Sequence, residues 1–300
     1  MGLDNFDDKN IVLTLGMFDG VHIAHSRILK ECAEKAREYN TKSVCITYDP
    51  HPLEVLGKGK QVKLLTTIDE KIGLIKGCGI DILVIIKFTK EFADLSALDF
   101  ITEINNKTAP REIIVGYRTT FGKERSGNAG FLRDFCEEHN IKLSVVEHIS
   151  SDNETISSSH IRALIKEGKI AEANDLLGRA YSVKGKVIHG DARGRALGFN
   201  TANIQVGDEN KLLPLSGVYG AKVMIDDKKY KGILSTGERP TFGRDFSIEV
   251  HIFDFADDIY GKEITCYFID FLRGIIKFDT KEELIAQIKQ DISSIFLKKD

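Results

Sequence analysis

Residues 11–25, IVLTLGMFDGVHIAH, decide the fold of the first half of the chain. The aliphatic run at residues 11–15 predicts a buried strand, and the glycine-bearing segment from Gly16 to His22 predicts a loop that leads into a helix. Strands that alternate with helices indicate βαβ units, so we expect a doubly wound α/β domain with a parallel sheet. Four further aliphatic runs that alternate with helical patterns predict strands at residues 43–48, 82–88, 112–115 and 142–146.

The pattern changes after residues 158–177, which predict a pair of helices. From Tyr181 onward, short β-rich runs are separated by glycine-bearing turns, which is typical of a small antiparallel β-barrel. These runs cover residues 182–187, 218–225, 230–234, 248–253 and 264–271. Thr280 and Glu283 form a capping-box pattern that predicts a C-terminal helix. We therefore expect two domains, residues 1–179 and residues 180–300.

The composition is that of a globular protein of 300 residues, long enough for two domains, with 42% hydrophobic and 29% charged residues. A net charge of −3 excludes the overall basic field that drives nucleic-acid binding. The five cysteines are widely spaced without a C-x-x-C pair, which argues against a disulfide framework or a zinc site. The N-terminus is unlike a signal peptide and no apolar run is long enough to span a bilayer. We expect a cytoplasmic protein without nucleic-acid or membrane partners, and the sequence carries no signal for an oligomeric state.

The first candidate site is the loop after the first strand, because doubly wound sheets bind ligands at the carboxyl ends of their strands. His22 and His25 stand three residues apart at the expected start of a helix. Backbone N–H groups at a helix start attract phosphate, and two imidazoles on one turn can donate hydrogen bonds to it. The alternatives are a capping turn with incidental histidines, or a metal site of the H-x-x-H type.

Two further segments have the chemistry of a phosphate or substrate site. Residues 157–159 are three serines before a helix that carries Arg162. Hydroxyl and N–H groups can hold a di- or triphosphate and the arginine can neutralise pyrophosphate, although serines before a helix are more often plain N-caps. The turn at residues 49–52 (Asp-Pro-His-Pro) ends the second strand and is a candidate substrate contact, or only a turn.

Four segments in this half, GMFDGVHIAH (16–25), YDPHP (48–52), VGYRTTFGKERSGN (115–128) and ISSSHIR (156–162), resemble a known family in order and spacing. They resemble the nucleotidyltransferase half of the bacterial bifunctional riboflavin kinase/FMN adenylyltransferase (FAD synthetase) family. The resemblance implies that His22 and His25 stabilise the α-phosphate of ATP while the FMN phosphate attacks it. It also implies further contacts, with the nucleotide from Gly16, Phe18, Asp19, Gly20, Ser158, Ser159 and Arg162, and with the flavin from Asp49, His51, Pro52 and Arg118.

The second half contains a basic, glycine-bearing loop, residues 190–200, that enters a strand at Thr201. A threonine hydroxyl and the amide oxygen of Asn203 are suitable ligands for a magnesium-bound phosphate. The alternative is a hairpin with solvent-exposed arginines. A similar turn at residues 235–242 has a cationic centre, and Glu249 lies in an alternating run where period two predicts a solvent-facing strand residue.

The order of these segments resembles the riboflavin kinase half of the same family, through TAN (201–203), GVY (217–219), RPT (239–241), IEVH (248–251), DIYG (258–261) and residues 273–278. The resemblance implies that Glu249 is the general base that takes the proton from the ribityl 5′-hydroxyl of riboflavin. It implies that Thr201 and Asn203 hold Mg²⁺ and the nucleotide. It also implies nucleotide contacts from Gly194 and Gly198 and flavin contacts from Arg239 and Arg273.

Five positions depart from the family pattern. Ala24 replaces a glycine between the histidines, and Arg118 stands where an acid or amide is usual. In the second half the departures are at Asn200, Ser235 and Ile275, where proline, asparagine and an acid are usual.

The expected function is the synthesis of flavin cofactors by two transferase modules. Riboflavin and Mg²⁺-ATP would give FMN in the kinase module, and FMN and ATP would give FAD and pyrophosphate in the nucleotidyltransferase module. Two alternatives remain: a monofunctional FAD synthetase with a degenerate kinase module, and a flavin-binding regulator without turnover.

Overall fold

The computed structural model of this chain describes residues 6, 8–57, 62–147, 150–151, 154–190, 199–238 and 246–297. It divides into two compact units, Met1–Ser158 and Ser159–Asp300. The division falls earlier than the boundary predicted at residues 179 and 180, because the helix pair before that boundary is bound to the strands after it: Asn174 Nδ2 donates to Phe268 O at 2.9 Å. The boundary predicted from the sequence stays a prediction.

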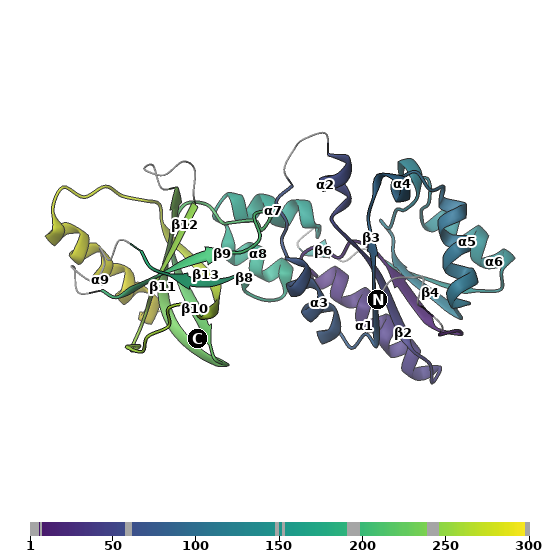
Figure 1. Ribbon diagram of the computed structural model, residues 1–300, viewed down its shortest axis with the longest axis horizontal. Helices are drawn as coiled ribbons and strands as arrows, with labels where there is room; N and C mark the ends of the chain where they lie inside the picture. Colours follow the sequence, from purple (N-terminus) through teal and green to yellow (C-terminus); the bar gives the residue numbers. More distant parts are fainter. Residues whose placement is uncertain are drawn as a thin grey trace. The chain divides into compact units, whose positions relative to one another are not determined.

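The first unit is an α/β domain with the predicted five-stranded parallel sheet (Figure 1). The strand order is β3-β2-β1-β4-β5, which confirms the doubly wound arrangement. Its strands are β1 (Val12–Leu15), β2 (Ser43–Asp49), β3 (Ile82–Lys87), β4 (Glu112–Gly116) and β5 (Lys142–Val146), followed by the short pair β6 (Ser150–Ser151) and β7 (Glu154–Thr155). Its α-helices are α1 (Ile23–Glu38), α2 (Pro52–Leu56), α3 (Ile68–Gly77), α4 (Lys90–Ala93), α5 (Ala97–Thr108) and α6 (Ala129–Glu138).

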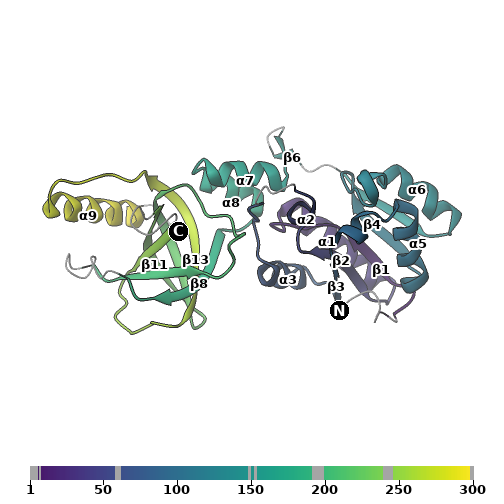
Figure 2. The ribbon, with the colours of Figure 1, turned by 45° about the horizontal axis from the view of Figure 1, so that its top comes forward.

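Both faces of this sheet are buried under helices, as Figures 1 and 2 show. Successive residues of a strand point to opposite faces, so Val12 of β1 packs with the apolar side chains of α1 and α3. Its neighbour Leu13 packs on the other face with those of α5 and α6. A strand buried on both faces is mostly apolar, which explains why four of the five residues at 11–15 are aliphatic, with Thr14 as the one buried polar residue.

The second unit is the predicted antiparallel barrel, which is closed in the order β10-β11-β12-β9-β8-β13. Closure leaves no unpaired strand edge. The unit contains α7 (Ser158–Lys166), α8 (Ile170–Leu177), β8 (Tyr181–Ile188), β9 (Thr201–Val206), β10 (Gly217–Ile225), β11 (Lys228–Glu238), β12 (Phe246–Ile252), β13 (Glu263–Arg273) and α9 (Lys281–Leu297). The helix predicted from Thr280 is therefore present.

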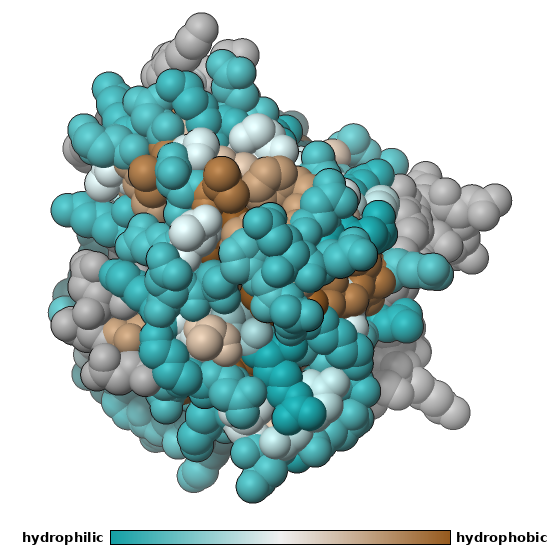
Figure 3. Space-filling view, turned by 90° about the vertical axis from the view of Figure 1, so that its right-hand side faces the viewer, coloured by the Kyte–Doolittle hydropathy of each residue, from teal (hydrophilic) through white to brown (hydrophobic). Residues whose placement is uncertain are grey.

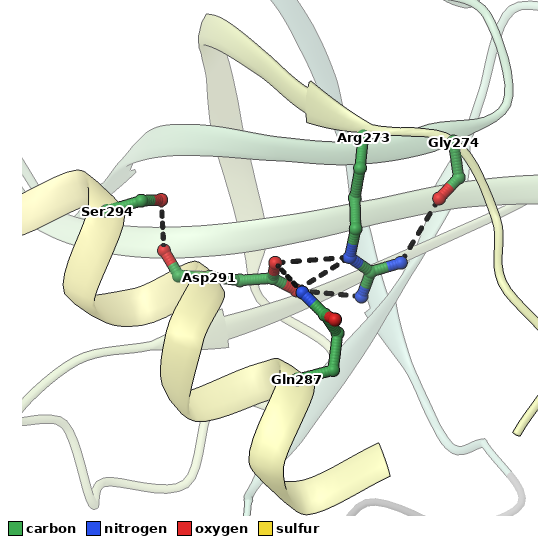
Figure 4. A network of polar contacts seen from close by, with 5 residues as sticks. All are labelled: Arg273, Gly274, Gln287, Asp291 and Ser294. Atoms are coloured by element: carbon green, nitrogen blue, oxygen red, sulfur yellow. Dashed lines mark hydrogen bonds and ion pairs between the residues drawn. The ribbon is translucent and has the colours of Figure 1, made fainter. Parts of the chain in front are cut away.

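Residues of the barrel strands alternate between its interior and its outer surface. In β12, Ile248 and Val250 are buried, and Glu249 between them is half-buried and points the other way. Part of the outer surface is covered by α9, whose Ile292 and Ile295 pack against a buried apolar cluster of Val218, Ile233 and Phe253. The helix is also held by a polar contact between Arg273 and Asp291 (Figure 4).

None of the helices within the described ranges is long and apolar enough to cross a membrane. The face of the molecule shown in Figure 3 is mainly hydrophilic, with small hydrophobic areas between polar side chains.

Candidate functional sites

The first candidate site begins with the loop that joins β1 to α1. Three residues of this loop have positive φ: Phe18 (50°), Gly20 (82°) and Val21 (37°). A positive φ favours glycine at position 20, and a Cβ at this position would also lie 2.6 Å from Cδ1 of Leu65. The loop therefore turns sharply at the carboxyl end of β1 and delivers His22 to the start of α1.

His22 and His25 lie against each other at this helix start, as the sequence predicts. His22 is the N-cap of α1, and its Nδ1 accepts a hydrogen bond from the backbone N–H of His25 at 3.3 Å. The two rings are stacked, with centroids 3.5 Å apart, and Phe18 contacts the His25 ring by its edge. Because Nδ1 is an acceptor, the neutral ring of His22 carries its proton on Nε2 and can donate from there. Two stacked imidazoles beside a helix N-terminus favour an anionic ligand.

Asp19 anchors this loop to the segment before α3. Its carboxylate is buried and accepts hydrogen bonds from the backbone N–H groups of Leu65 and Thr66 and from the Thr66 hydroxyl, at 3.1–3.2 Å. Its backbone carbonyl accepts from Ser158 Oγ at 2.8 Å. Ser158 therefore fastens the serine segment at residues 157–159 to the loop through the backbone carbonyl of Asp19.

Ser158 is the first residue of α7, and Ser159 and Arg162 follow in the same helix. Arg162 lies one turn from the helix start, where the backbone N–H groups favour anions. The nucleotide role of these two residues stays a prediction.

The turn after β2 is more ordered than the sequence suggests, because it starts a short helix, α2. His51 is the N-cap: its Nδ1 accepts from Leu53 N at 3.1 Å, and its own N–H donates to the Glu54 carboxylate at 2.9 Å. This is a capping box with histidine in the place of serine or threonine, a substitution for which the sequence offers no signal. Asp49 is exposed immediately before it.

A row of aromatic rings was not predicted as part of the site. It begins at Tyr48 at the end of β2 and continues in edge-to-face or tilted contacts, with centroids 5.5–6.0 Å apart between neighbours. The rings are those of Tyr48, Phe88, Phe92, Phe100, Phe121 and Phe131. Phe88 and Phe92 follow the end of β3 and are half-buried, so this edge of the sheet offers apolar aromatic surface.

Two departures from the family pattern fall in this unit. Ala24 is the second residue of α1 and has helical backbone, a conformation that does not require glycine. Arg118 is exposed in the loop after β4, with its guanidinium 5.4 Å from the ring of Tyr117.

The second candidate site lies on the outer surface of the barrel. Glu249 of β12 is directly opposite Asn203 of β9 in the antiparallel register, and Thr201 is opposite His251. Directly paired residues have Cβ atoms about 4.5–5.5 Å apart, and diagonal pairs such as Glu249 and Thr201 about 7–8 Å. The three side chains that the resemblance assigns to the kinase therefore share one face of two neighbouring strands. Ser235 of β11 is opposite Glu249 on its other side.

The side chain of Asn203 is fixed by the start of the loop before β9. A Cβ at Gly190 would collide with the Asn203 carboxamide, so this glycine is needed for the close approach. Asn200, which replaces the usual proline, has its carbonyl oxygen 2.8 Å from Nδ1 of His251. That contact ties the entry of β9 to β12. The predicted residues Gly194, Gly198 and Arg239 lie outside the described residues.

A cavity of about 260 Å³ adjoins this site. Thr201 and Asn200 line it, together with side chains from the barrel interior and from the segment after β12. Most of these are apolar: Val187, Ala202, Val250, Ile252, Phe255, Ile259 and Tyr260. Asp257 and Asp258 add two carboxylates. The cavity has the composition of a small-molecule pocket, which is mostly apolar with a few polar groups.

Arg273, predicted to contact the flavin, has a structural partner. Its Nε and Nη2 donate to the Asp291 carboxylate at 2.7–3.1 Å, and Nη1 donates to Gly274 O at 3.1 Å (Figure 4). Gln287 also donates to this carboxylate. The guanidinium thus ties the end of β13 to α9, and its flavin contact stays a prediction. Ile275, in the following loop, is 56% exposed.

Within the described ranges, no three His, Cys, Asp or Glu side chains form a cluster that could hold a metal ion. The hydroxyl of Thr201 and the amide oxygen of Asn203 are oxygen donors of the kind that Mg²⁺ shares with phosphates and water. This donor set fits a metal that arrives with a nucleotide.

Comparison with known proteins identifies the two units. Residues 4–160 match the FAD synthetase family and residues 177–296 match the riboflavin kinase family. A bifunctional riboflavin kinase/FMN adenylyltransferase of Listeria monocytogenes is 38% identical over 291 residues, which cover 96% of this chain and 92% of that protein. A protein of the same name from Bacillus subtilis is 35% identical over 285 residues, 93% of this chain and 90% of that protein.

A crystal structure of a Streptococcus pneumoniae protein, described as a macrolide-efflux protein, has the same fold. Its TM-score is 0.92 at 29% identity, with 99% of this chain and 98% of that chain covered. With both halves matched in one polypeptide and in this order, the chain belongs to the bifunctional riboflavin kinase/FMN adenylyltransferase family.

Proposed function

We propose that this chain phosphorylates riboflavin to FMN and adenylylates FMN to FAD, with ATP as the donor in both reactions. The observation that supports this proposal most is a pair of separate side-chain arrangements, each suited to binding phosphate. One is the stacked His22–His25 pair at the carboxyl edge of a parallel sheet. The other is the Glu249–Asn203 pair on neighbouring strands of a closed barrel.

For FAD formation, the FMN phosphate oxygen attacks the α-phosphorus of ATP and pyrophosphate leaves. Negative charge grows on the α-phosphate oxygens as the new bond forms, and His22 and His25 donate hydrogen bonds to them. Ser158, Ser159 and Arg162 bind the departing phosphates, and Gly16, Phe18, Asp19 and Gly20 contact the nucleotide. The aromatic surface at Phe88 and Phe92 suits an isoalloxazine ring next to Asp49 and His51. Positioning and charge stabilisation suffice, and no covalent enzyme intermediate is required.

For FMN formation, the Glu249 carboxylate takes the proton of the ribityl 5′-hydroxyl while that oxygen attacks the γ-phosphorus and ADP leaves. Thr201 and Asn203 hold the nucleotide from the neighbouring strand. The cavity beside Thr201 suits the adenine base, because aliphatic and aromatic side chains make up most of its lining and a few polar residues stand among them. Mg²⁺ bound with ATP would neutralise phosphate charge at Thr201 and Asn203.

Two single substitutions test the separation of the sites. His25→Ala is expected to abolish FAD formation from FMN and to leave FMN formation from riboflavin unchanged, and Glu249→Gln is expected to do the reverse. Chromatography of flavins after incubation with ATP and magnesium distinguishes the products. Loss of both products from either single change would contradict independent sites.

The alternatives are separated by the flavin that is supplied. A monofunctional FAD synthetase would convert FMN to FAD but leave riboflavin unchanged. A flavin-binding regulator would quench flavin fluorescence without consuming ATP. The presence of Glu249 opposite Asn203, in the register that the kinase reaction needs, favours the bifunctional enzyme over both.

We also propose that the protein acts in the cytoplasm, without nucleic-acid or membrane partners. All five cysteines are free thiols and four of them are buried, which suits a reducing compartment. Fractionation of cells that express a tagged protein tests this location.

A further inference from the structure

Lys71 of α3 is a buried lysine beside the first site, and the sequence gives no hint of it. Lys71 is only 6% exposed, and lysines are almost never fully buried without a partner. Its Nζ donates a hydrogen bond to the backbone carbonyl of Tyr48 at 2.9 Å. Tyr48 is the last buried residue of β2, immediately before exposed Asp49. The ammonium is therefore attached to the end of the strand that leads into the Asp49–Pro52 turn.

The segment just before the same helix is fastened to the histidine loop. The Asp19 carboxylate binds the N–H groups of Leu65 and Thr66, and Thr66 Oγ1 accepts from Gly20 N at 3.1 Å. The next residue, Thr67, is the N-cap of α3, and its carbonyl accepts from the N–H of Lys71 at 2.9 Å. One short path of hydrogen bonds thus joins the loop after β1, the start of α3 and the end of β2.

Charge also concentrates around this lysine. Burial lowers the pKa of Lys71, and the carboxylates of Asp19, Asp49 and Glu54, with the Cys45 thiol, act in the opposite direction. These groups come from the loop after β1, from β2 and from α2, and they are the charged and titratable groups that face the ammonium. Asp19 belongs to the loop that the proposed reaction uses to bind phosphates, and Asp49 belongs to the turn that it uses to bind the flavin. Carboxylates without a counter-charge would repel those phosphates.

We propose that Lys71 is a positioning residue for adenylyl transfer, whose ammonium holds the end of β2 against the histidine loop and offsets the carboxylates of Asp19 and Asp49. This inference rests on the proposed conversion of FMN to FAD. Lys71 acts through the backbone of Tyr48 and through the local charge, and does not itself contact the reacting atoms.

The test compares three variants of the full chain. Lys71→Met removes the charge, Lys71→Arg retains it at every accessible pH, and Lys76→Met removes an exposed lysine from the same helix as a control. Lys71→Met is expected to lower kcat/KM for FAD formation from FMN by about 10- to 100-fold, the effect of misplacing reacting groups by about 1 Å. Lys71→Arg is expected to stay within about tenfold of the unchanged enzyme, and Lys76→Met to match it. Formation of FMN from riboflavin should be unchanged in all three.

The pH dependence provides a second readout that a purely structural role would not give. As pH rises through the lowered pKa of Lys71, the folded protein loses the ammonium while the unfolded chain keeps it until about 10.4. The unfolded state then binds more protons, so the contribution of Lys71 to folding stability rises with pH in this window. FAD formation is expected to fall over the same window. Activity and this contribution to stability therefore move in opposite directions, and Lys71→Arg should remove the alkaline fall in activity.

The inference is overturned if Lys71→Met forms FAD as fast as the unchanged enzyme, if Lys71→Arg is as inactive as Lys71→Met, or if the alkaline fall is the same with arginine. If Lys71→Met does not fold, the alkaline limbs of Lys71→Arg and the unchanged enzyme still decide it. Absence of FAD from the unchanged enzyme would instead refute the proposed function.

Discussion

Replacing Asp291 by leucine is expected to destabilise the barrel unit and to release α9 from it. Asp291 is 5% exposed, and the Arg273 side chain is 17% exposed, so the substitution leaves a largely desolvated guanidinium without its carboxylate. Breaking a buried ion pair by removing one partner costs about 3–5 kcal/mol. The figure near 3 kcal/mol is expected here, because the arginine retains some water and its bond to Gly274 O. For a unit of about 140 residues, 3 kcal/mol corresponds to a fall in Tm of roughly 10 °C.

The assay is thermal unfolding of the full chain by circular dichroism, with hydrogen exchange of the α9 amides to localise the effect. The double variant Arg273→Met/Asp291→Leu is the key comparison, because replacing both ions by apolar side chains is often neutral or stabilising. It should recover most of the lost Tm. Glu263→Leu, which breaks the exposed pair of Lys184 and Glu263, should change Tm by less than about 2 °C. An Asp291→Leu variant with unchanged Tm, or a double variant as unstable as the single one, would refute the reasoning.

Three further changes test other parts of the structure. Gly20→Ala places a methyl group against Leu65 at a φ of 82°, so FAD formation should fall at least about tenfold, while FMN formation from riboflavin, followed by chromatography, serves as the internal control. The pKa of Asp81 is lowered: burial alone would raise it, but hydrogen bonds from the N–H and Oγ of Ser43 outweigh burial. The stability that this carboxylate contributes is present above its ordinary pKa of 3.8 and is lost as pH falls. The free energy of unfolding measured with urea should therefore fall less on acidification in Asp81→Asn than in the unchanged protein. Ala202→Leu adds bulk to the cavity beside Thr201 and should raise the KM for ATP in FMN formation about tenfold, without effect on FAD formation from supplied FMN; an unchanged KM would place the base elsewhere.

Periodicity was sufficient for the larger elements of this chain. The runs at residues 11–15 and 43–48 are mostly apolar because both faces of these parallel strands are buried. The run around Glu249 alternates because only one face of this barrel strand is buried. The short helix α2 escaped prediction, since its start depends on the imidazole of His51 as N-cap and not on a residue type that signals a helix. Such local capping contacts decide four- and five-residue helices, which have too few residues for a periodic pattern.

The candidate sites were predictable in part for the same reason. His22 and His25 stand out because they follow a strand and begin a helix, and their stacking follows from spacing along one turn. Lys71 was missed, and the contact of Arg273 with Asp291 was not predicted, because the partner of each lies elsewhere in the sequence, at Tyr48 and Asp291. A lysine on a helix looks solvent-exposed until the fold shows what covers it. The backbone at Ala24 is helical, so alanine fits at this position as well as the glycine that is usual in the family.

The pairing of Glu249 with Asn203 limits how this half of the protein can change in length. Successive residues of a strand face opposite sides, so one inserted or deleted residue in β9 or β12 would turn one of these two side chains toward the barrel interior. The closed ring of strands cannot absorb that slip at an open edge. Length variation among related chains is therefore expected in the connections between strands, and the paired segments themselves should keep a constant number of residues.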